Sequence, residues 1–279
     1  MVSKVFCPVG KTWGSNIIRM VDRDLPGLKF LFLSESLRSR HGSVLEVGCS
    51  GGRHLRSLIA IRQDIKFFGC DIDGVSVRQG HRISPEIDFV VGDGLSLPYK
   101  KGVFDAVAIM DFLEHVTDAN RAIEEAHRVL KLGGIITAFV PCEGNRLSFY
   151  YLFYRLFGFN VKAPAAGHTQ FFTSDELLDL MKRNGLKVER VRYSYHFLGA
   201  FFDFALFLIV YLSRKVADLW WSSNKYYRDQ SRALSSILSS FFNSTLEVTN
   251  LIAYYESRFL RNVKVFACGV HFVAMKSVE

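Results

Sequence analysis

The chain has 279 residues, of which 49% are hydrophobic and 22% are charged, a balance that excludes a disordered or fibrous protein. The length suits one α/β domain that carries insertions. The net charge of +8 favours anionic neighbours, but the basic residues form no block, so nucleic acid is not favoured as a partner.

Short apolar runs alternate with helical stretches between Val44 and Val140, after an N-terminal region, residues 1–43, that we expect to form a helical cap. This alternation predicts a parallel sheet with helices on both faces. The predicted strands are Val44–Cys49, Lys66–Asp71, Asp88–Val91, Phe104–Met110 and Ile135–Val140. The predicted helices between them are Arg53–Arg62, Gly74–Arg82 and Asp118–Leu130, the last capped by Asp118.

The second half of the chain adds one helix and two strands to the same single domain, residues 1–279. The helix is predicted over Thr173–Asn184, because Thr173 can cap it and Glu176 follows three residues later. The strands are predicted at Lys187–Tyr195 and Lys264–Met275. An aromatic insertion, residues 143–166, and a hydrophobic helical insertion, residues 196–262, interrupt this part.

A glycine-rich turn, Gly48-Cys49-Ser50-Gly51-Gly52, follows the first strand and opens a helix. Glycine lets the backbone approach a ligand, and the N–H groups at the start of a helix point toward it. The turn is therefore a generic nucleotide-binding signal, although glycines can also serve only to make a tight turn.

Four acidic residues stand on or after the first four strands, and the carboxyl ends of these strands share one edge of the sheet. They are Glu46, Asp71, Asp93 and Asp111. Carboxylates repel the pyrophosphate of a dinucleotide but attract the sulfonium and ammonium groups of S-adenosylmethionine (SAM). The acids therefore favour SAM over NAD, and Ser50 also breaks the dinucleotide fingerprint at its second glycine.

Six motifs together carry a family resemblance: Glu46–Gly52, Gly69–Ile72, Val91–Pro98, Phe104–Val107, Leu113–Val116 and Leu130–Gly134. With them, Val44–Glu189 resembles the class I SAM-dependent methyltransferases, particularly the small-molecule and lipid group that contains the ubiquinone and menaquinone methyltransferases. The resemblance implies an α/β fold with a doubly wound, Rossmann-like sheet of seven strands. This sheet is mostly parallel, its last strand is antiparallel, and helical insertions accompany it.

The resemblance also implies a cofactor site. Glu46, Gly48, Ser50 and Gly52 would hold the methionine moiety, with Asp111 near its amino-acid end. Asp71 and Ile72 would hold the ribose, and Asp93 and Gly94 the adenine. Cys49 and Leu95 are assigned to the same site, and Ser50 stands where the family usually has glycine.

Two histidines are candidates for a general base. Methyl transfer is an in-line displacement that depends on alignment and on exclusion of water, and a base helps when the acceptor is a hydroxyl. His115 follows the fourth strand, where it could instead cap the next helix. His168 lies in the loop before Thr173, where a structural role is equally compatible with the sequence, and Glu114 and Glu143 are carboxylate alternatives.

The insertions favour a hydrophobic acceptor. Residues 146–159 contain seven aromatic rings, too many for one helix face. The segment Phe197–Leu212 is apolar except for Asp203 and is shorter than the roughly 20 residues that cross a bilayer. Extension back to Tyr193 would give a marginal length. Basic and aromatic residues typical of a headgroup-level anchor follow it: Arg214, Lys215, Trp220 and Trp221.

The sequence therefore predicts methyl transfer from SAM to an oxygen or carbon of a hydrophobic or lipid-linked small molecule. Residues 196–221 would contact a membrane surface or form a lid. Five scattered cysteines and the absence of a secretory pattern favour a cytoplasmic protein, at the inner face of a membrane if this segment is an anchor, with no metal site. The alternatives are an RNA or protein methyltransferase, a non-catalytic SAM-binding or membrane-adaptor protein, and an NAD-dependent oxidoreductase.

Overall fold

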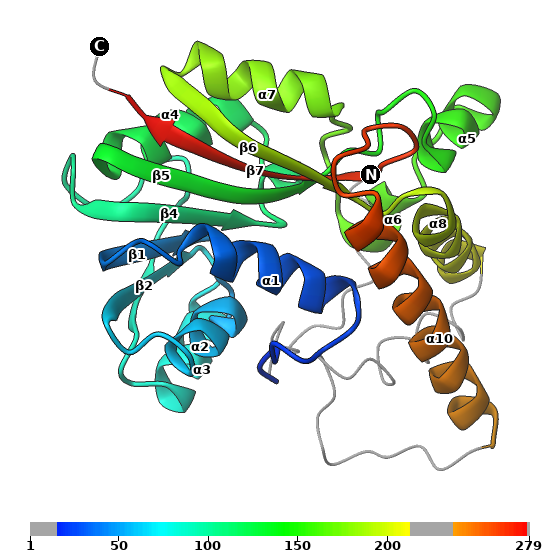
Figure 1. Ribbon diagram of the computed structural model, residues 1–279, viewed down its shortest axis with the longest axis horizontal. Coiled ribbons are helices and arrows are strands. Elements are labelled where there is room, and N and C mark those ends of the chain that lie inside the picture. Colours follow the sequence, from blue (N-terminus) through cyan, green and yellow to red (C-terminus); the bar gives the residue numbers. More distant parts are fainter. Residues whose placement is uncertain (1–15, 213–236, 278–279) are drawn as a thin grey trace.

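A computed structural model describes residues 16–212 and 237–277 of the chain. Its seven-stranded sheet has the order β3-β2-β1-β4-β5-β7-β6, and β7 runs antiparallel to both of its neighbours (Figure 1). The predicted doubly wound, mostly parallel sheet with an antiparallel last strand is confirmed. The strands are β1 (Gly42–Val47), β2 (Ile65–Asp71), β3 (Asp88–Val91), β4 (Phe104–Met110), β5 (Leu130–Pro141), β6 (Leu186–Ser194) and β7 (Gly269–Lys276).

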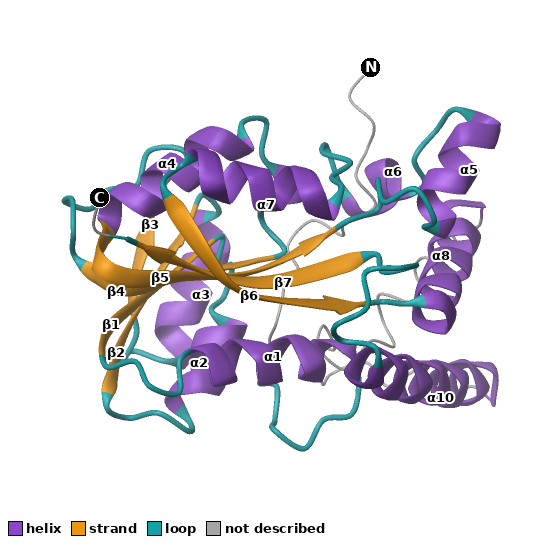
Figure 2. Cartoon of the chain, turned by 45° about the horizontal axis from the view of Figure 1, so that its top comes forward, coloured by secondary structure: helices purple, strands orange, loops and turns teal. Residues whose placement is uncertain are grey.

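Helices cover both faces of this sheet (Figure 2). One face carries α1 (Leu25–Ser36), α2 (Arg53–Ile59) and α3 (Gly74–Ile83), and the other carries α4 (Ala119–Val129) and α7 (Ser174–Arg183). The short 3-10 helix η1 (Leu113–His115) follows β4. The insertion helices gather beyond one end of the sheet: α5 (Phe149–Phe157), α6 (Lys162–Ala166), α8 (Phe197–Leu212) and α10 (Ile237–Phe259).

Alternate residues of the central strands enter two separate cores. Leu45 and Val107 pack with the apolar side chains of α4 and α7, whereas Val44 and Ala106 pack with those of α1 and α2. All four are fully buried. Burial on both faces explains why these strands are continuous apolar runs in the sequence.

The predicted helix starts are confirmed where a polar side chain caps the helix. Asp118 accepts a hydrogen bond from the Arg121 amide at the start of α4. Thr173 and Glu176 form a reciprocal capping box on α7, so two amides that the helix itself leaves unpaired have partners.

Several predicted boundaries are wrong for local reasons. The last strand begins at Gly269 instead of Lys264, because Phe266 has a φ of 62°, which a strand cannot accommodate. The helix that begins at Arg53 ends at Ile59, where a turn begins. β5 begins at Leu130, before the predicted Ile135, because its register with β4 shifts at this point.

The aromatic insertion divides its rings between the interior and the surface, as the sequence predicts. Tyr150 is 2% exposed, whereas Phe157 is 62% exposed. The second insertion begins with α8, which has the predicted bounds, but extension back to Tyr193 is wrong because β6 continues to Ser194. Within the described ranges, no helix combines the length and apolar character needed to span a bilayer. The predicted anchor residues Arg214, Lys215, Trp220 and Trp221 lie outside the described residues.

Candidate active site

The carboxyl edge of the parallel strands brings the predicted acidic residues into one region. Glu46 lies on β1, Asp71 ends β2, Asp93 lies just beyond β3, and Asp111 directly follows β4. The strand register places Val47 beside residues of both β2 and β4, so the loops after these three strands are neighbours.

The loop after β1 uses its glycines for conformation and for packing. Gly48 and Gly52 both have a φ of 72°, which side-chain-bearing residues rarely adopt. A Cβ atom at Gly48 would lie 2.4 Å from the ring of Phe112, and one at Gly52 would lie 2.4 Å from the ring of Phe89. Ser50 also has a positive φ, 49°, a conformation that glycine adopts more readily than serine.

Asp71 organises this loop. Its Oδ2 accepts a hydrogen bond from the Ser50 amide at 2.7 Å, and its Oδ1 accepts one from the Asp73 amide at 2.8 Å. A carboxylate accepts about four hydrogen bonds, so capacity remains for ligand hydroxyls. Ile72 follows with 74% of its surface exposed and offers apolar contact area at the same edge.

The turn after β3 contacts the glycine loop through one aromatic side chain. Asp93 Oδ1 accepts a hydrogen bond from the Leu95 amide at 2.9 Å, and the Asp93 side chain is exposed. A Cβ at Gly94 would lie 2.5 Å from the Phe112 ring. Phe112 therefore contacts the backbone at both Gly48 and Gly94 and sets the spacing of the two loops, a role that no sequence motif indicates.

Glu46 is buried beside His54 at the start of α2. Glu46 Oε1 lies 2.7 Å from His54 Nδ1, while Glu46 Oε2 is a buried oxygen without a hydrogen-bond partner among the described residues. Such an unpartnered group costs about 1–3 kcal/mol, which a ligand donor would recover. Cys49 lies in the same region, and burial together with Glu46 and Asp71 raises the pKa of its thiol, which therefore stays neutral.

Asp111 is paired with Lys29 of α1. Lys29 Nζ donates to both carboxylate oxygens, at 2.7 and 2.8 Å, and lies 3.8 Å from the centroid of the Phe139 ring. Burial alone would raise the pKa of Asp111, but Lys29 lowers it and keeps the group ionised. The edge is therefore less negative than the four acids of the sequence imply.

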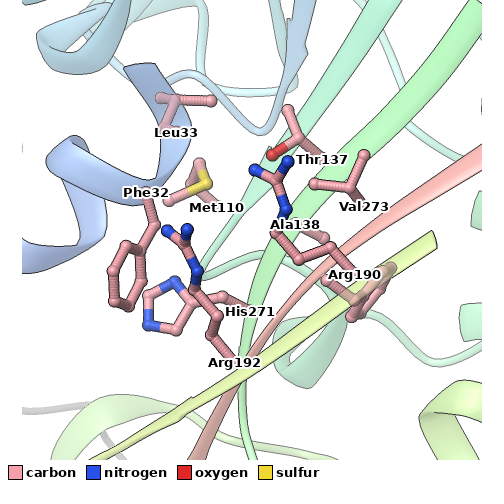
Figure 3. Close-up of a pocket in the computed structure, with 10 residues that line it drawn as sticks. Phe32, Leu33, Met110, Thr137, Ala138, Arg190, Arg192, His271 and Val273 are labelled. Carbon is pink, nitrogen blue, oxygen red and sulfur yellow. The ribbon is translucent and has the colours of Figure 1, made fainter. Parts of the chain in front are cut away.

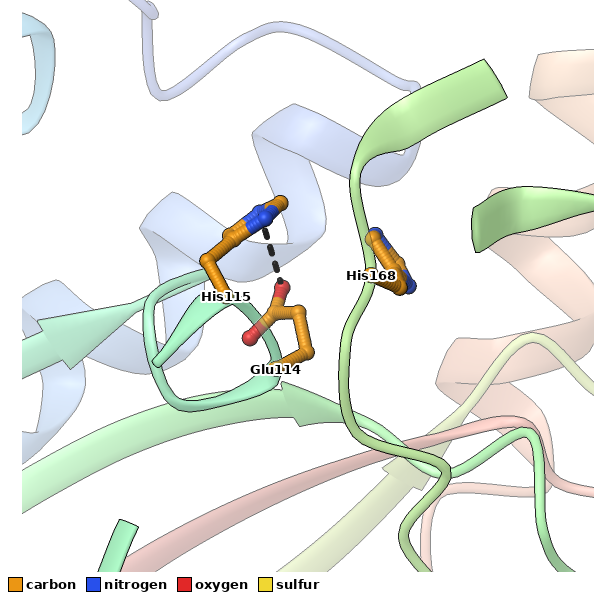
Figure 4. Close-up of side chains that lie close together, drawn as sticks. All are labelled: Glu114, His115 and His168. Atoms are coloured by element: carbon orange, nitrogen blue, oxygen red, sulfur yellow. Dashed lines mark ion pairs between the residues drawn. The ribbon is translucent and has the colours of Figure 1, made fainter. Parts of the chain in front are cut away.

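Glu114, His115 and His168 lie together beside this edge (Figure 4). The rings of His115 and His168 meet edge to face with 5.1 Å between centroids, and His115 Nε2 lies 3.8 Å from Glu114 Oε1. Asp118 caps the following helix, so His115 is not needed for that purpose. The structure brings together the two histidines that the sequence singled out separately.

Hydrogen bonds determine which nitrogen of each histidine carries hydrogen in the neutral state. His115 Nδ1 lies 3.2 Å from the Gly167 carbonyl oxygen, which can only accept, so Nδ1 is the donor. His168 Nδ1 lies 3.0 and 3.2 Å from the two oxygens of Glu143. The lone pair of each neutral ring is therefore at Nε2, as a general base requires.

The two neighbouring carboxyl groups, Glu143 and Glu114, differ in protonation state. Burial would raise the pKa of Glu143, but His168 and Lys162 lower it to about 2. Burial, with Asp111 and Glu143 nearby, raises the pKa of Glu114 well above its usual range, so Glu114 is protonated at neutral pH. A metal ion needs a deprotonated ligand. Glu114, His115 and His168 are therefore better suited to hydrogen bonding than to holding an ion, and the expectation of no metal stays a prediction.

Glu143 also connects the histidines to the insertion helices. Lys162 Nζ on α6 lies 3.2 Å from Glu143 Oε1 and 2.8 Å from Asp203 Oδ2 on α8. The Tyr150 hydroxyl on α5 donates to the same Asp203 oxygen at 2.7 Å. Lys162 carried no sequence signal, and Asp203 was interpreted only as an obstacle to membrane crossing.

A small pocket lies between α1 and the sheet, away from the predicted cofactor loops (Figure 3). Phe32 and Leu33 of α1 form one side, and His271 of β7 and Arg192 of β6 form the other. Arg192 already pairs with Glu35 and stacks on the Phe32 ring, so the pocket is part of the packing of α1.

Comparisons with known proteins find similarity to methyltransferases. Residues 45–138 match a family model described as a methyltransferase domain. The chain is 29% identical over 134 residues to a probable chloroplastic tocopherol O-methyltransferase of Oryza sativa subsp. japonica, over 46% of this chain and 36% of that protein. It is 24% identical over 133 residues to a mitochondrial 2-methoxy-6-polyprenyl-1,4-benzoquinol methylase of Leishmania donovani, over 46% of each. The match thus spans less than half of either relative.

Among solved structures, the crystal structure of the cyclase SpnF superposes with a TM-score of 0.57 at 18% identity, covering 98% of this chain and 88% of that one. At this identity the likeness shows the fold alone. Residues 45–138 are thus similar to a methyltransferase domain, and the order of the strands is that of the doubly wound sheet that the sequence resemblance implies. The family match supports SAM as the cofactor.

Proposed function

We propose that this protein transfers a methyl group from SAM to an oxygen or carbon of a hydrophobic or lipid-linked small molecule. The observation that carries the proposal is the buried pair of His168 and Glu143, which lies beside the edge where the glycine loop and its acids meet. Bound SAM would supply an electrophilic methyl group. The protein's own residues would bind the two substrates, align them and accept a proton.

In this proposal, different residues at the carboxyl edge of the sheet bind different parts of SAM. The unpartnered Glu46 oxygen would accept a hydrogen bond from the ammonium group of SAM. The backbone of Gly48, Cys49, Ser50 and Gly52 would lie beside this group. Asp71 and Ile72 would bind the ribose. The turn of Asp93, Gly94 and Leu95 would bind the adenine. Asp111 would stay paired with Lys29 and border the amino-acid end.

His168 is proposed as the base for a hydroxyl acceptor. Its Nε2 would take the hydroxyl proton as the oxygen attacks, and the Glu143 carboxylate would stabilise the imidazolium that forms. His115 stays neutral, because burial and the nearby His168 lower its pKa, and it would orient the acceptor. For a carbon acceptor that is activated by a neighbouring hydroxyl, His168 Nε2 would take the proton of that hydroxyl in the same position.

The hydrophobic acceptor is supported by the relatives and by the insertions. The two relatives are named for tocopherol and for a polyprenyl benzoquinol, both lipophilic ring compounds. In this chain the rings of Phe149 and Phe153 on α5 both pack against the ring of Phe204 on α8. Apolar side chains therefore border the network that ends at His168.

The reaction can be tested with SAM that carries a labelled methyl group, incubated with the purified protein and a membrane extract. We expect label in the organic phase. Label confined to RNA or protein would instead support the alternative acceptors. Binding of SAM without transfer to any fraction would support a non-catalytic SAM-binding or adaptor protein.

We also propose that the insertion end of the molecule contacts a membrane surface and that the protein works at its cytoplasmic face. Leu156 and Phe157 of α5 are 78% and 62% exposed. Leu212, the last residue of α8, is 72% exposed, and Phe259, the last residue of α10, is 87% exposed. Exposed apolar side chains at one end of a soluble fold commonly mark an interaction surface.

Leu156→Asp is expected to weaken binding to anionic phospholipid vesicles by roughly tenfold or more, because it removes the apolar contact that Leu156 would make with the bilayer and adds a negative charge that anionic lipids repel. Flotation of the full-length protein with vesicles would measure this. Leu132→Asp is the matched control, since Leu132 is 62% exposed in β5, outside the insertions. Equal loss in both variants, or no vesicle binding by the wild type, would contradict the proposal.

A further inference from the structure

A series of ion pairs connects α8 to His168. Asp203 contacts Lys162 at 2.8 Å, Lys162 contacts Glu143 at 3.2 Å, and Glu143 contacts His168 at 3.0 Å. The side chains of Lys162, Glu143 and His168 are at most 9% exposed, and that of Asp203 is 17% exposed. Water screens such charges poorly, so each one influences the next.

We propose that Lys162 and Asp203 are positioning residues, which set the orientation and basicity of His168 through Glu143 and so couple the packing of α8 to catalysis. The catalytic part of this inference rests on the proposed function. The effect on the His168 ring itself does not depend on methyl transfer.

The coupling arises because Lys162 and His168 share one carboxylate. Glu143 favours a proton on His168, and the positive charge of Lys162 reduces that preference. Asp203 offsets part of the Lys162 charge. Removal of the Lys162 charge should therefore make His168 more basic, and removal of the Asp203 charge should make it less basic.

The same contacts tie three insertion helices together. Lys162 Nζ lies 4.6 Å from the Tyr150 ring centroid on α5 and 4.9 Å from the Phe207 ring centroid on α8. Burial alone would lower the pKa of Lys162, but Asp203 and Glu143 raise it, so Lys162 is charged. Because a buried cation needs its anionic partners, α8 must stay packed on α6 for the network to hold.

Titratable and charged groups approach His168 and its partners from every surrounding element. Those on η1 and after the central strands act near the ring, whereas those on the insertion helices act through Glu143. They are Glu114 and His115 on η1, Asp111 after β4, Cys142 and Glu143 after β5, Tyr150 on α5, Lys162 on α6, Asp203 on α8 and Cys268 before β7. Burial raises the pKa of both Cys142 and Cys268, which therefore stay neutral thiols.

The test is titration of the His168 imidazole by NMR in the full chain with isotope-labelled histidine, with His168→Gln used to assign its signal. Lys162→Met should move the titration of the His168 imidazole to higher pH. Asp203→Asn should move it to lower pH by a smaller amount, because Asp203 acts from one ion pair further away. The double variant should titrate between the two single variants, since the two removed charges are opposite.

Lys162→Arg keeps the charge and should leave the His168 titration unchanged. If Lys162→Met does not fold, Asp203→Asn decides alone: a lower pKa supports the coupling, and an unchanged or higher pKa overturns it. Shifts in the same direction in both single variants would also overturn it, since they would report a general structural change. A protein whose His168 titrates as expected but which transfers no methyl group would contradict the proposed function and leave this coupling standing.

Discussion

His168→Ala is expected to lower kcat by roughly 10²- to 10⁴-fold on a hydroxyl acceptor and to leave the affinity for SAM unchanged. The reason is that His168 Nε2 carries the available lone pair while Nδ1 faces the Glu143 carboxylate. Steady-state kinetics together with calorimetry of SAM binding would separate the two quantities. Glu143→Gln should reproduce much of the loss, because an amide cannot stabilise the imidazolium to the same degree.

His81→Ala is the control for this experiment, since His81 is an exposed histidine on α3. It should leave both kcat and SAM affinity at wild-type values. If His168→Ala kept full activity on a hydroxyl acceptor, His168 would not be the base. A loss of SAM affinity in the same variant would instead indicate damage to the cofactor site.

Asp71→Ala is expected to weaken SAM binding by roughly 100-fold or more. A carboxylate that accepts two ligand hydroxyls contributes hydrogen bonds of about 1.5–3 kcal/mol each, and about 1.4 kcal/mol corresponds to tenfold in affinity. Asp71 also accepts the Ser50 and Asp73 amides, so its loss loosens the loop as well. Calorimetric titration of the purified protein with SAM measures the effect.

Asp179→Ala provides the comparison, because Asp179 is an exposed acid on α7 that pairs with Lys182. Its SAM affinity should match the wild type. Circular dichroism would show whether Asp71→Ala is folded. A folded Asp71→Ala protein with unchanged SAM affinity would be incompatible with the proposed cofactor site.

The fold could be predicted because its signals are local. The glycine turn, the acids at strand ends and the cap residues Asp118 and Thr173 each act within a few positions of the element that they define. The errors at element boundaries fall at local irregularities of the backbone that the residue pattern does not indicate. The start of β7 is one example, because Phe266, just before it, has a positive φ.

The site could be predicted only in part, because its contacts join segments that are far apart in the chain. His115 and His168 were each identified from their positions, but their contact joins segments more than 50 residues apart in the chain. Lys29 pairs with Asp111 across a separation of 82 residues, and nothing near Lys29 in the sequence indicates a site. Glu143 was named as an alternative base, whereas its contacts with His168 and Lys162 make it a partner of the base.

The Phe112 ring limits which residues the turns after β1 and β3 can carry. Because the ring occupies the space that side chains at Gly48 and Gly94 would need, neither position can take a larger residue without a change at the ring. A single substitution at Phe112 would therefore alter the packing of both turns at once, although Phe112 belongs to neither.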